Sequence, residues 1–512
     1  MRPILSVLTA CLLVCPHAFA AEPADAKPKP NIVYILCDDL GYGDVHCLNP
    51  ERGKIATPNL DRLRSEGMAF TDCHSSSSVC TPSRYSILTG RYAWRSSLQK
   101  GVLSGYSPPL LAADRLTVPA LLKQQGYTTA CIGKWHLGMN LPKKQPSPKI
   151  TDGPTTRGFD RYFGISASLD MPPYAFIEND HFTEPVTTVK KIYKRPGPAA
   201  AGFEAVKVVP TLTLKAVDFI NEQAKTKTPF FLYLPLPSPH TPILPNAEWQ
   251  GKSRLGKYGD YVMETDWAVG QVLAALDKAG VAGNTLVMFT SDNGCSRAAG
   301  IPEMEAKGHY PSAQFRGSKS DIWDGGHRIP FLVRWPGTIK ADSHSEQIVC
   351  LSDLLATCAD IFGAKLPDNA GEDSVSLLPA LLGTDKAPLH DAIVNHSIEG
   401  RFAIRQGNWK LELCAGSGGW SSPKDVAAVR AGLPPIQFYN MHDDVGEKVN
   451  LEKQDPELIA RLTKLLEKYV ADGRSTPGVP QKNDAAVDIS KNHLNNPAKT
   501  KRVRRQAEAV GD

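Results

Sequence analysis

Asn31-Ile-Val-Tyr-Ile-Leu-Cys37, followed at once by Asp38 and Asp39, sets the architecture that we predict for this 512-residue chain. The run is short and apolar, and Pro30 and the two carboxylates bound it. Such a run is typical of a strand that is buried on both faces, as in a parallel sheet between layers of helices. The two carboxylates would then lie at the carboxyl end of that strand.

Four further runs repeat this pattern, and helical patterns separate them. The predicted strands are residues 128–132, 229–236, 285–290 and 330–335. The predicted helices are residues 59–68, 117–125, 211–224, 258–279 and 351–362. Strands that alternate with helices predict an α/β domain with a largely parallel sheet flanked by helices. Active sites of such sheets form at the carboxyl ends of the strands.

The pattern of the chain changes near residue 387, where the predicted elements become shorter. They are strands at residues 392–396, 402–405 and 410–413 and an amphipathic helix at residues 456–469. We therefore predict a catalytic domain over residues 31–386 and a smaller C-terminal α+β domain, an antiparallel sheet plus a helix, over residues 387–475. Residues 476–512 are polar and end in a basic cluster, which predicts a disordered tail.

The N-terminus carries targeting information. A charged start, an apolar stretch and the cleavage motif Ala18-Phe19-Ala20 indicate a signal peptide over residues 1–20, with a linker over residues 21–30. The protein is therefore expected to be exported, either periplasmic or secreted, and lipid attachment through Cys11 is the alternative. No later apolar run is long enough to span a bilayer. The net charge of +5 is small and scattered, which gives no indication of a nucleic-acid partner.

Nine cysteines remain after the leader, an odd number. They are widely spaced and contain no C-x-x-C motif, so most of them are predicted to be small buried side chains rather than a disulfide framework. At least one thiol of an exported protein is then without a disulfide partner, and it needs another explanation.

Acidic and amide side chains follow two of the predicted strands. Asp38 and Asp39 end the first strand, and Asp292 and Asn293 follow the strand at residues 285–290. Adjacent carboxylates repel each other in a partly buried site unless a cation lies between them. Each pair could instead cap a turn, but two pairs at the ends of two buried strands favour a metal. Oxygen donors suit calcium or magnesium rather than zinc.

Cys80-Thr-Pro-Ser-Arg84 is predicted to begin a helix, because Pro82 suits a first helical turn. Cys80 would then lie at the helix N-terminus, where backbone N–H groups favour an anion, with Arg84 on the same face. An unmodified thiol in such an electropositive pocket would be activated. The alternative is a structural cysteine beside a helix cap.

Cations and imidazoles follow other predicted strands. Lys134 and His136 follow the strand at residues 128–132, His240 follows the strand at residues 229–236, and Lys319 precedes the strand at residues 330–335. Each could be a solvated side chain on a surface loop. Their shared position beside core strands makes them candidates for one site.

These motifs together resemble the type I, formylglycine-dependent sulfatases. Cys80-Thr-Pro-Ser-Arg84 and Thr89-Gly90-Arg91 match the C-x-P-S-R and T-G-R signature, and the resemblance extends over residues 31 to about 471. It is closer to arylsulfatases and N-acetylgalactosamine-6-sulfatases than to choline sulfatases. It implies an alkaline-phosphatase-like fold with a mixed, largely parallel sheet.

The resemblance implies a modified cysteine and one metal ion. Cys80 would be converted to Cα-formylglycine by a maturation enzyme, which would account for an unpaired cysteine. One calcium ion would be bound by the side chains of Asp38, Asp39, Asp292, Asn293 and the modified Cys80. The formylglycine hydrate would be the nucleophile, and the calcium ion would hold the sulfate group.

The resemblance also implies roles for the cations and imidazoles. Arg84 and Lys134 would steady the hydrated side chain, and His136 would accept its second proton. His240 and Lys319 would contact the bridging oxygen, where His240 would protonate the leaving group.

The implied activity is hydrolysis of sulfate monoesters, on sulfated carbohydrates or aryl sulfates. Ser168 would contact the sulfate group. Residues 170–181, 300–314 and 416–422 are candidate sugar-recognition loops, and Trp420 could stack on a sugar ring. The alternatives are a phosphodiesterase or phosphonate monoester hydrolase of the same fold, and a non-catalytic binder of sulfated glycans.

Overall fold

The computed structural model describes residues 28–142 and 149–491. The predicted signal peptide, most of the predicted linker and the basic cluster of the tail lie outside the described residues. No helix of the described residues is long and apolar enough to cross a membrane.

Within the described residues the main sheet has ten strands. In spatial order they are β13 (Ser343–Ser345), β2 (Met68–Phe70), β12 (Phe331–Arg334), β11 (Thr285–Ser291), β1 (Asn31–Asp38), β10 (Phe230–Pro239), β4 (Thr128–Lys134), β5 (Arg161–Ile165), β6 (Ile177–Glu178) and β7 (His181–Phe182). The five strands from β11 to β5 are parallel to one another. Antiparallel pairs join β12, β2, β6 and β7 to this parallel centre, so the sheet is mixed, as predicted.

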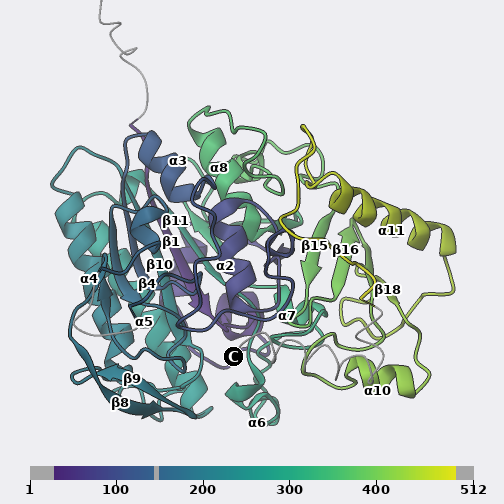
Figure 1. The fold of residues 1–512 in the computed structure, drawn as a ribbon, viewed down its shortest axis with the longest axis horizontal. Helices are drawn as coiled ribbons and strands as arrows, with labels where there is room; N and C mark the ends of the chain where they lie inside the picture. Colours follow the sequence, from purple (N-terminus) through teal and green to yellow (C-terminus); the bar gives the residue numbers. More distant parts are fainter. Residues whose placement is uncertain (1–27, 143–148, 492–512) are drawn as a thin grey trace, which may run out of the picture.

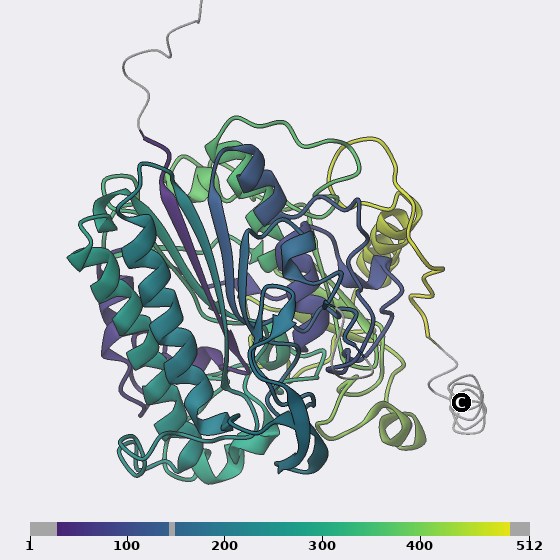
Figure 2. The same cartoon turned by 60° about the vertical axis from the view of Figure 1, so that its left-hand side comes forward.

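Strand β1 is buried along its whole length, and its side chains alternate between two helical layers. Val33, Ile35 and Cys37 belong to one core, with residues of α1 (Pro58–Ser65), α4 (Val208–Gln223) and α5 (Lys257–Lys278). Ile32, Tyr34 and Leu36 belong to the other core, with residues of α2 (Cys80–Thr89), α3 (Val118–Gln124) and α8 (Leu354–Ile361). Figures 1 and 2 show the two layers on opposite faces of the sheet.

The C-terminal sheet is antiparallel, as predicted, and contains four strands in the described residues. They are β15 (Ile393–His396), β16 (Phe402–Gln406), β17 (Trp409–Glu412) and β18 (Gln437–Asn440). Helix α11 (Pro456–Ala471) packs on this sheet through Leu462, Leu466 and Tyr469. The apolar repeat of α11 explains why its position could be predicted from sequence.

The remaining elements are short. They are β3 (Cys73–His74), which pairs with β14 (Val349–Cys350), the hairpin of β8 (Val186–Ile192) and β9 (Arg195–Ala200), and the helices α6 (Ile301–Glu305), α7 (Asp324–His327), α9 (Leu378–Leu381) and α10 (Asp425–Arg430). The β8–β9 hairpin was not predicted from the sequence, because its strands are largely exposed and show no regular alternation of apolar and polar residues.

Two predictions outside the sheets have clear outcomes. All nine cysteines of the described residues are free, and only Cys47 among them is not buried, which confirms that they form no disulfide framework.

The prediction of a disordered tail is wrong for residues 476–491. Buried Arg91 donates to the Lys482 carbonyl and pairs with Asp484, and Arg95 donates to Asn483. This segment is ordered because it supplies partners to buried guanidinium groups.

Candidate active site

The polar residues predicted from the sequence converge at one edge of the main sheet. This edge is formed by the carboxyl ends of the parallel strands β1, β10, β11 and β4. Asp38 and Asp39 end β1, Asp292 follows β11, and His240 follows β10. Lys134 is the last residue of β4. Parallel pairing in register therefore gathers side chains that are far apart in sequence.

Asp38 and Asp292 share the buried guanidinium group of Arg84. Arg84 Nε donates to Asp292 Oδ2 at 2.9 Å, and its terminal nitrogen lies 3.8 Å from Asp38 Oδ1. Lys134 Nζ donates to Asp38 Oδ2 at 2.6 Å. Burial opposes ionisation of Asp38, but Lys134, His240 and Arg84 outweigh it and hold its pKa well below the usual value. Burial and the charge of Asp38 raise the pKa of Asp292 to about 6.

Asp39 is the centre of a second set of contacts. Lys319 Nζ donates to Asp39 Oδ2 at 2.9 Å, and Asn293 Nδ2 donates to Asp39 Oδ1 at 2.8 Å. His240 Nε2 lies 3.7 Å from Asp39 Oδ2. The backbone of Asp39 has φ 68°, a left-handed conformation that is uncommon for residues other than glycine. Such conformations are found mostly where the surrounding structure enforces them, often at functional sites.

Cys80 is the first residue of α2 and is buried. Its Sγ lies 3.4 Å from Asp38 Oδ1 and 3.6 Å from Lys319 Nζ. The helix start at Cys80 and the proximity of cations agree with prediction, but the activated thiol does not. Burial raises the pKa of Cys80, and the nearby Lys134 and Lys319 only partly offset it. The unmodified thiol is therefore protonated at neutral pH and is a poor nucleophile.

The two predicted histidines hold different hydrogen bonds. His136 Nε2 pairs with the Leu103 carbonyl at 2.8 Å, while its buried Nδ1 has no protein partner. Burial, with the charge of Lys134, keeps the pKa of His136 well below its usual value, so the ring is neutral. His240 Nδ1 donates to the Thr241 carbonyl at 2.6 Å, which leaves Nε2 toward Asp39.

Ser168 lies in the segment that follows β5 and is buried, and its Oγ has no protein partner. This segment adjoins the site, because the backbone N–H of His136 donates to the Ser166 carbonyl at 2.9 Å. Asn293 Oδ1 is also buried without a partner. Buried polar atoms normally have a hydrogen-bond partner. Two such atoms without a protein partner, beside a cluster of carboxylates, indicate that a ligand can bind there.

The donor set fits a hard cation. Asp38, Asp39, Cys80 and His240 offer ligand atoms within 4.8 Å of one another, and Asp292 and Asn293 border them. Carboxylate oxygens and the free Asn293 Oδ1 match the oxygen ligands that calcium prefers.

A family model described as Sulfatase matches residues 30–364 of the chain. The chain belongs to the sulfatase family. This sulfatase is 31% identical to the N-acetylgalactosamine-6-O-sulfatase of Bacteroides thetaiotaomicron, over 90% of this chain and 96% of the relative. It is 35% identical to Arylsulfatase A of Bos taurus, over 85% of each chain. The sulfatase is therefore a sulfuric ester hydrolase.

Solved structures agree with this assignment. One, described under glycosaminoglycan metabolism by Bacteroides thetaiotaomicron, has a TM-score of 0.77 at 31% identity and covers 86% of the sulfatase and 99% of its own chain. The complex of Ps i-CgsB with k-i-k-neocarrahexaose has a TM-score of 0.68 at 25% identity, over 92% and 98% of the two chains. The phosphonate monoester hydrolase of Agrobacterium radiobacter, at 18% identity and a TM-score of 0.57, shares the fold.

One buried cluster was not predicted as a unit. His74, Asp324 and His327 offer ligand atoms within 4.8 Å of one another, apart from the Asp38 group. Lys410 of β17 donates to Asp324 Oδ1 at 2.9 Å and to Glu447 Oε1 at 2.5 Å. An ammonium group thus already compensates these carboxylates, which makes the cluster an ionic contact between the main domain and the C-terminal sheet. Lys410 and Asp324 are 86 residues apart in sequence, so no local motif indicates that they pair.

Proposed function

We propose that this sulfatase hydrolyses sulfate monoesters of sulfated carbohydrates and accepts aryl sulfates as small substrates. The observation that carries the proposal is the position of Cys80, at the start of α2 between the Asp38 carboxylate and Lys319 Nζ. The carbohydrate class is supported by relatives, since the bacterial relative is an N-acetylgalactosamine-6-O-sulfatase and the solved Ps i-CgsB complex contains a neocarrahexaose.

In this proposal a maturation enzyme oxidises Cys80 to Cα-formylglycine, whose hydrate supplies the nucleophilic oxygen that the buried, protonated thiol lacks. The surroundings of Cys80 suit that hydrate. Asp38 Oδ1 can accept a hydrogen bond from a hydroxyl group at this position, and Lys319 Nζ can donate one.

The residues that would hold a calcium ion are Asp38, Asp39, Asp292, Asn293 and the modified Cys80. When bound, the ion supplies positive charge to the non-bridging sulfate oxygens. Lys134 and Arg84 contact the same carboxylates and limit the net negative charge of the pocket. Together these groups favour a transition state in which charge develops on the sulfuryl oxygens.

The histidines are proposed to move protons. His136 is neutral and has a free, buried Nδ1, so it can accept a proton from the hydrated side chain. His240 has its Nδ1–H bound to Thr241, so Nε2 is the atom that can donate a proton to the leaving oxygen. Lys319 would stabilise charge on that oxygen, and Ser168 Oγ would contact the sulfate group.

Two alternatives give different outcomes. A phosphodiesterase or phosphonate monoester hydrolase that uses two metals needs further histidine and aspartate ligands, and Asn293 is an amide where such a site could use a histidine. A non-catalytic binder of sulfated glycans would keep Cys80 as a thiol.

We also propose export through the signal peptide at residues 1–20, with lipid attachment at Cys11 as the alternative.

The experiment that tests the function is the mass of the tryptic peptide Ser65–Arg84, from a host with the maturation machinery and from a host without it. The expected result is an aldehyde at position 80, trapped by a hydrazine, in the first host only, together with release of sulfate from nitrophenyl sulfate. A thiol at position 80 in both hosts, with no sulfate release, would support the binder instead.

A further inference from the structure

Exposed aromatic side chains are few in this sulfatase. Among the described residues, the Phe, Tyr and Trp side chains are buried or partly buried except for Tyr106, Tyr193 and Trp420, which are 44%, 46% and 38% exposed. A large exposed aromatic ring leaves apolar surface in water, so a group of them on one side of a protein usually marks a binding surface. Tyr106 and Trp420 lie on segments that contact residues of the site or their neighbours, and Tyr193 lies on a hairpin that is joined through Tyr174 to the segment after Ser168.

Tyr106 lies on a loop that is fastened beside Cys80. Leu103, three residues earlier, accepts a hydrogen bond from His136 Nε2 at 2.8 Å, and its N–H donates to Thr81 Oγ1 at 3.2 Å. The same loop packs against the segment after Ser168, where a Cβ at Gly105 would lie 1.9 Å from the Pro172 carbonyl oxygen. Tyr106 is therefore held at the border of the pocket that contains His136.

Tyr193 forms the tip of the β8–β9 hairpin. The hydroxyl of Tyr174 fastens this tip to the segment after Ser168, since it lies 2.7 Å from the Arg195 carbonyl and 3.3 Å from the Asp170 carbonyl. Tyr193 has φ 57° in a two-residue turn, a position that normally holds Asn or Gly. An aromatic residue there is unfavourable for the turn, and its exposed ring is accompanied by the Lys194 ammonium group, 5.1 Å from the ring centroid.

Trp420 lies on the opposite side of the site, on a loop of the C-terminal domain. Its backbone N–H donates to Ser320 Oγ at 3.1 Å, next to Lys319, and to Asp321 Oδ1 at 3.0 Å. Exposed Arg297, four residues after Asn293, donates to the Trp420 carbonyl at 2.7 Å. Two loops that carry proposed site residues thus hold Trp420 in place.

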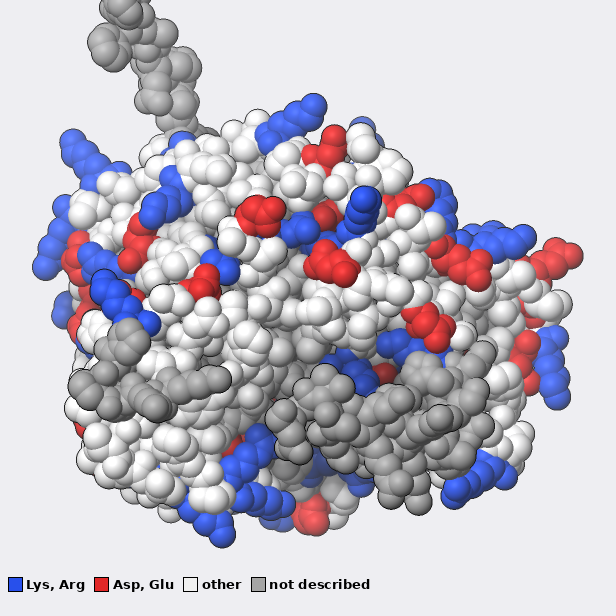
Figure 3. All heavy atoms as spheres, in the orientation of Figure 1, with Lys and Arg blue, Asp and Glu red and all other residues white. Residues whose placement is uncertain are grey.

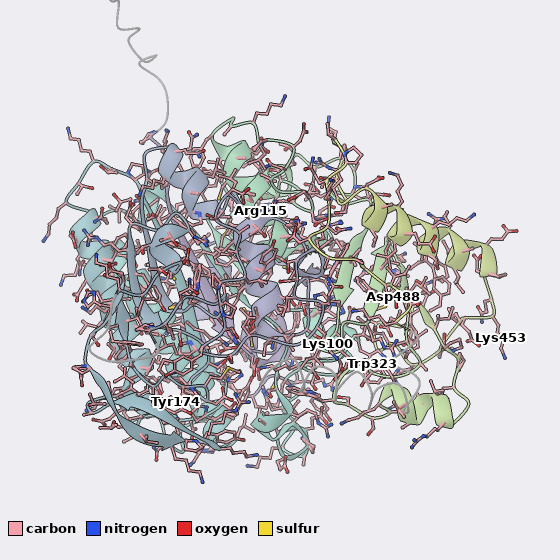
Figure 4. The ribbon with its side chains drawn as sticks, viewed as in Figure 1. Lys100, Arg115, Tyr174, Trp323, Lys453 and Asp488 are labelled. Atoms are coloured by element: carbon pink, nitrogen blue, oxygen red, sulfur yellow. The ribbon has the colours of Figure 1, made fainter. Side chains whose placement is uncertain are left out.

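The segments that hold Tyr193 and Trp420 lie on different sides of α2 (Figure 4). Figure 4 shows Tyr174, which fastens the hairpin, and Trp323, two residues from Asp321, on opposite sides of α2. Cations accompany the aromatic rings. Residues 186–200 carry four Lys and Arg and no acidic residue, in a chain whose net charge is +5. Figure 3 shows Lys and Arg side chains gathered along the lower edge, near the hairpin and α6.

We propose that Tyr106, Tyr193 and Trp420 are stacking positions for sugar rings on both sides of the sulfated residue, so that the preferred substrate is an oligosaccharide with further anionic groups. The inference rests on the proposed function and adds to it the length of the substrate. Sugar rings present flat C–H faces that suit aromatic rings, and exposed Lys194, Arg195 and Arg297 would pair with neighbouring sulfate or carboxylate groups.

The test compares kcat/KM on three substrates: nitrophenyl sulfate, N-acetylgalactosamine 6-sulfate and a chondroitin 6-sulfate hexasaccharide. The wild type is expected to prefer the hexasaccharide to the monosaccharide. Tyr193→Asn suits the left-handed turn and removes one of the three rings, and Trp420→Ala removes a second. Each substitution should lower the ratio of hexasaccharide to nitrophenyl sulfate turnover by about tenfold, which corresponds to the loss of one stacking contact. Trp420→Tyr keeps an aromatic ring at this position and should therefore keep most of the wild-type ratio of hexasaccharide to nitrophenyl sulfate turnover.

Leu214→Ala is the control, since Leu214 is 61% exposed and lies on α4, outside the three segments that carry the aromatic residues. It should leave all three rates unchanged. The proposal is overturned if the wild type shows no preference for the hexasaccharide, or if the aromatic variants keep the wild-type ratio. Equal losses on all substrates would also overturn it. A wild type with an aldehyde at position 80 that releases no sulfate from nitrophenyl sulfate would instead contradict the proposed function itself.

Discussion

His136 and Asp39 show how single residues are adapted to the site. Both have positive φ values, 57° and 68°, in a region of the backbone map that costs non-glycine residues about 1 kcal/mol or more. The side chain of His136 then has one nitrogen bound to Leu103 and one free, and that of Asp39 contacts Lys319 and Asn293. The surrounding structure therefore enforces side-chain positions that local preference would not select.

The role of His240 gives a prediction at this scale. His240→Ala should lower turnover of unactivated sugar sulfates by about 100-fold or more, because a poor leaving group needs a proton. It should lower turnover of nitrophenyl sulfate by less than about tenfold, because nitrophenolate leaves readily. The measurement is kcat on both substrates, with exposed His344→Ala on β13 as control. Equal losses on both substrates would remove His240 as the proton donor.

The amide of Asn293 gives a second prediction. Its buried Oδ1 has no protein partner, so it is free to bind a cation. Asn293→Ala should weaken calcium affinity by at least about tenfold, as measured by calorimetric titration of chelator-treated protein. Exposed Asn369→Ala should leave the affinity unchanged. An Asn293→Ala protein with wild-type calcium affinity would exclude Asn293 from the ligands.

At the scale of elements, β17 is tied to α7 by charge. Lys410 is buried and contacts Asp324, Glu412 and Glu447, while the backbone N–H of Asp324 donates to Glu447. Lys410→Met would remove the cation that the three buried carboxylates share. Of these carboxylates, within the described residues, only that of Asp324 keeps an arginine contact, to Arg328, so the substitution should lower the free energy of unfolding by about 3–5 kcal/mol. Urea unfolding measures this, with exposed Lys464→Met on α11 as control, expected within about 0.5 kcal/mol. A loss as small as that of the control would show that the cluster does not stabilise the contact between β17 and α7.

His396 joins β15 to the segment before Cys80, through backbone hydrogen bonds with Ser76 and Ser78. Burial, with the charge of Lys491, lowers the pKa of His396 to about 3. The unfolded chain binds a proton near pH 6.5 and the folded chain does not, so stability falls as pH drops from that value toward 3. The wild type should therefore lose about 2 kcal/mol more than His396→Gln between about pH 7.5 and about pH 5. Equal losses in urea titrations of the two proteins would contradict this assignment.

At the scale of the whole molecule, the nine thiols of the described residues are unpaired, and eight of them are buried. Burial, together with Asp61, raises the pKa of Cys47 to about 12, so even the partly exposed thiol reacts slowly. A chain expressed from residue 28 should show almost no thiol reaction when folded. In urea it should show nine reactive thiols from a host without the maturation enzyme and eight from a host with it. Nine in both hosts would argue against modification of Cys80.

Much of the fold could be predicted because its signals are local. The apolar run at residues 31–37, the helix repeat of α11 and the proline in the first turn of α2 each reflect a few neighbouring residues. The β8–β9 hairpin has no such signal, because its strands are mostly exposed. The antiparallel direction of β12 and the order of residues 476–491 depend on distant partners, which local pattern does not contain.

The same distinction holds for the site. The sequence alone determined which residue types are present, their position at the ends of strands, and the sulfatase signature around Cys80. Only the tertiary structure decided that Asp38, Asp292 and Arg84 share one contact, that the Cys80 thiol is buried and protonated, and that Lys410 compensates Asp324. The physical reason is that motifs record chemistry along the chain, whereas charge pairing and desolvation depend on packing between segments that are hundreds of residues apart.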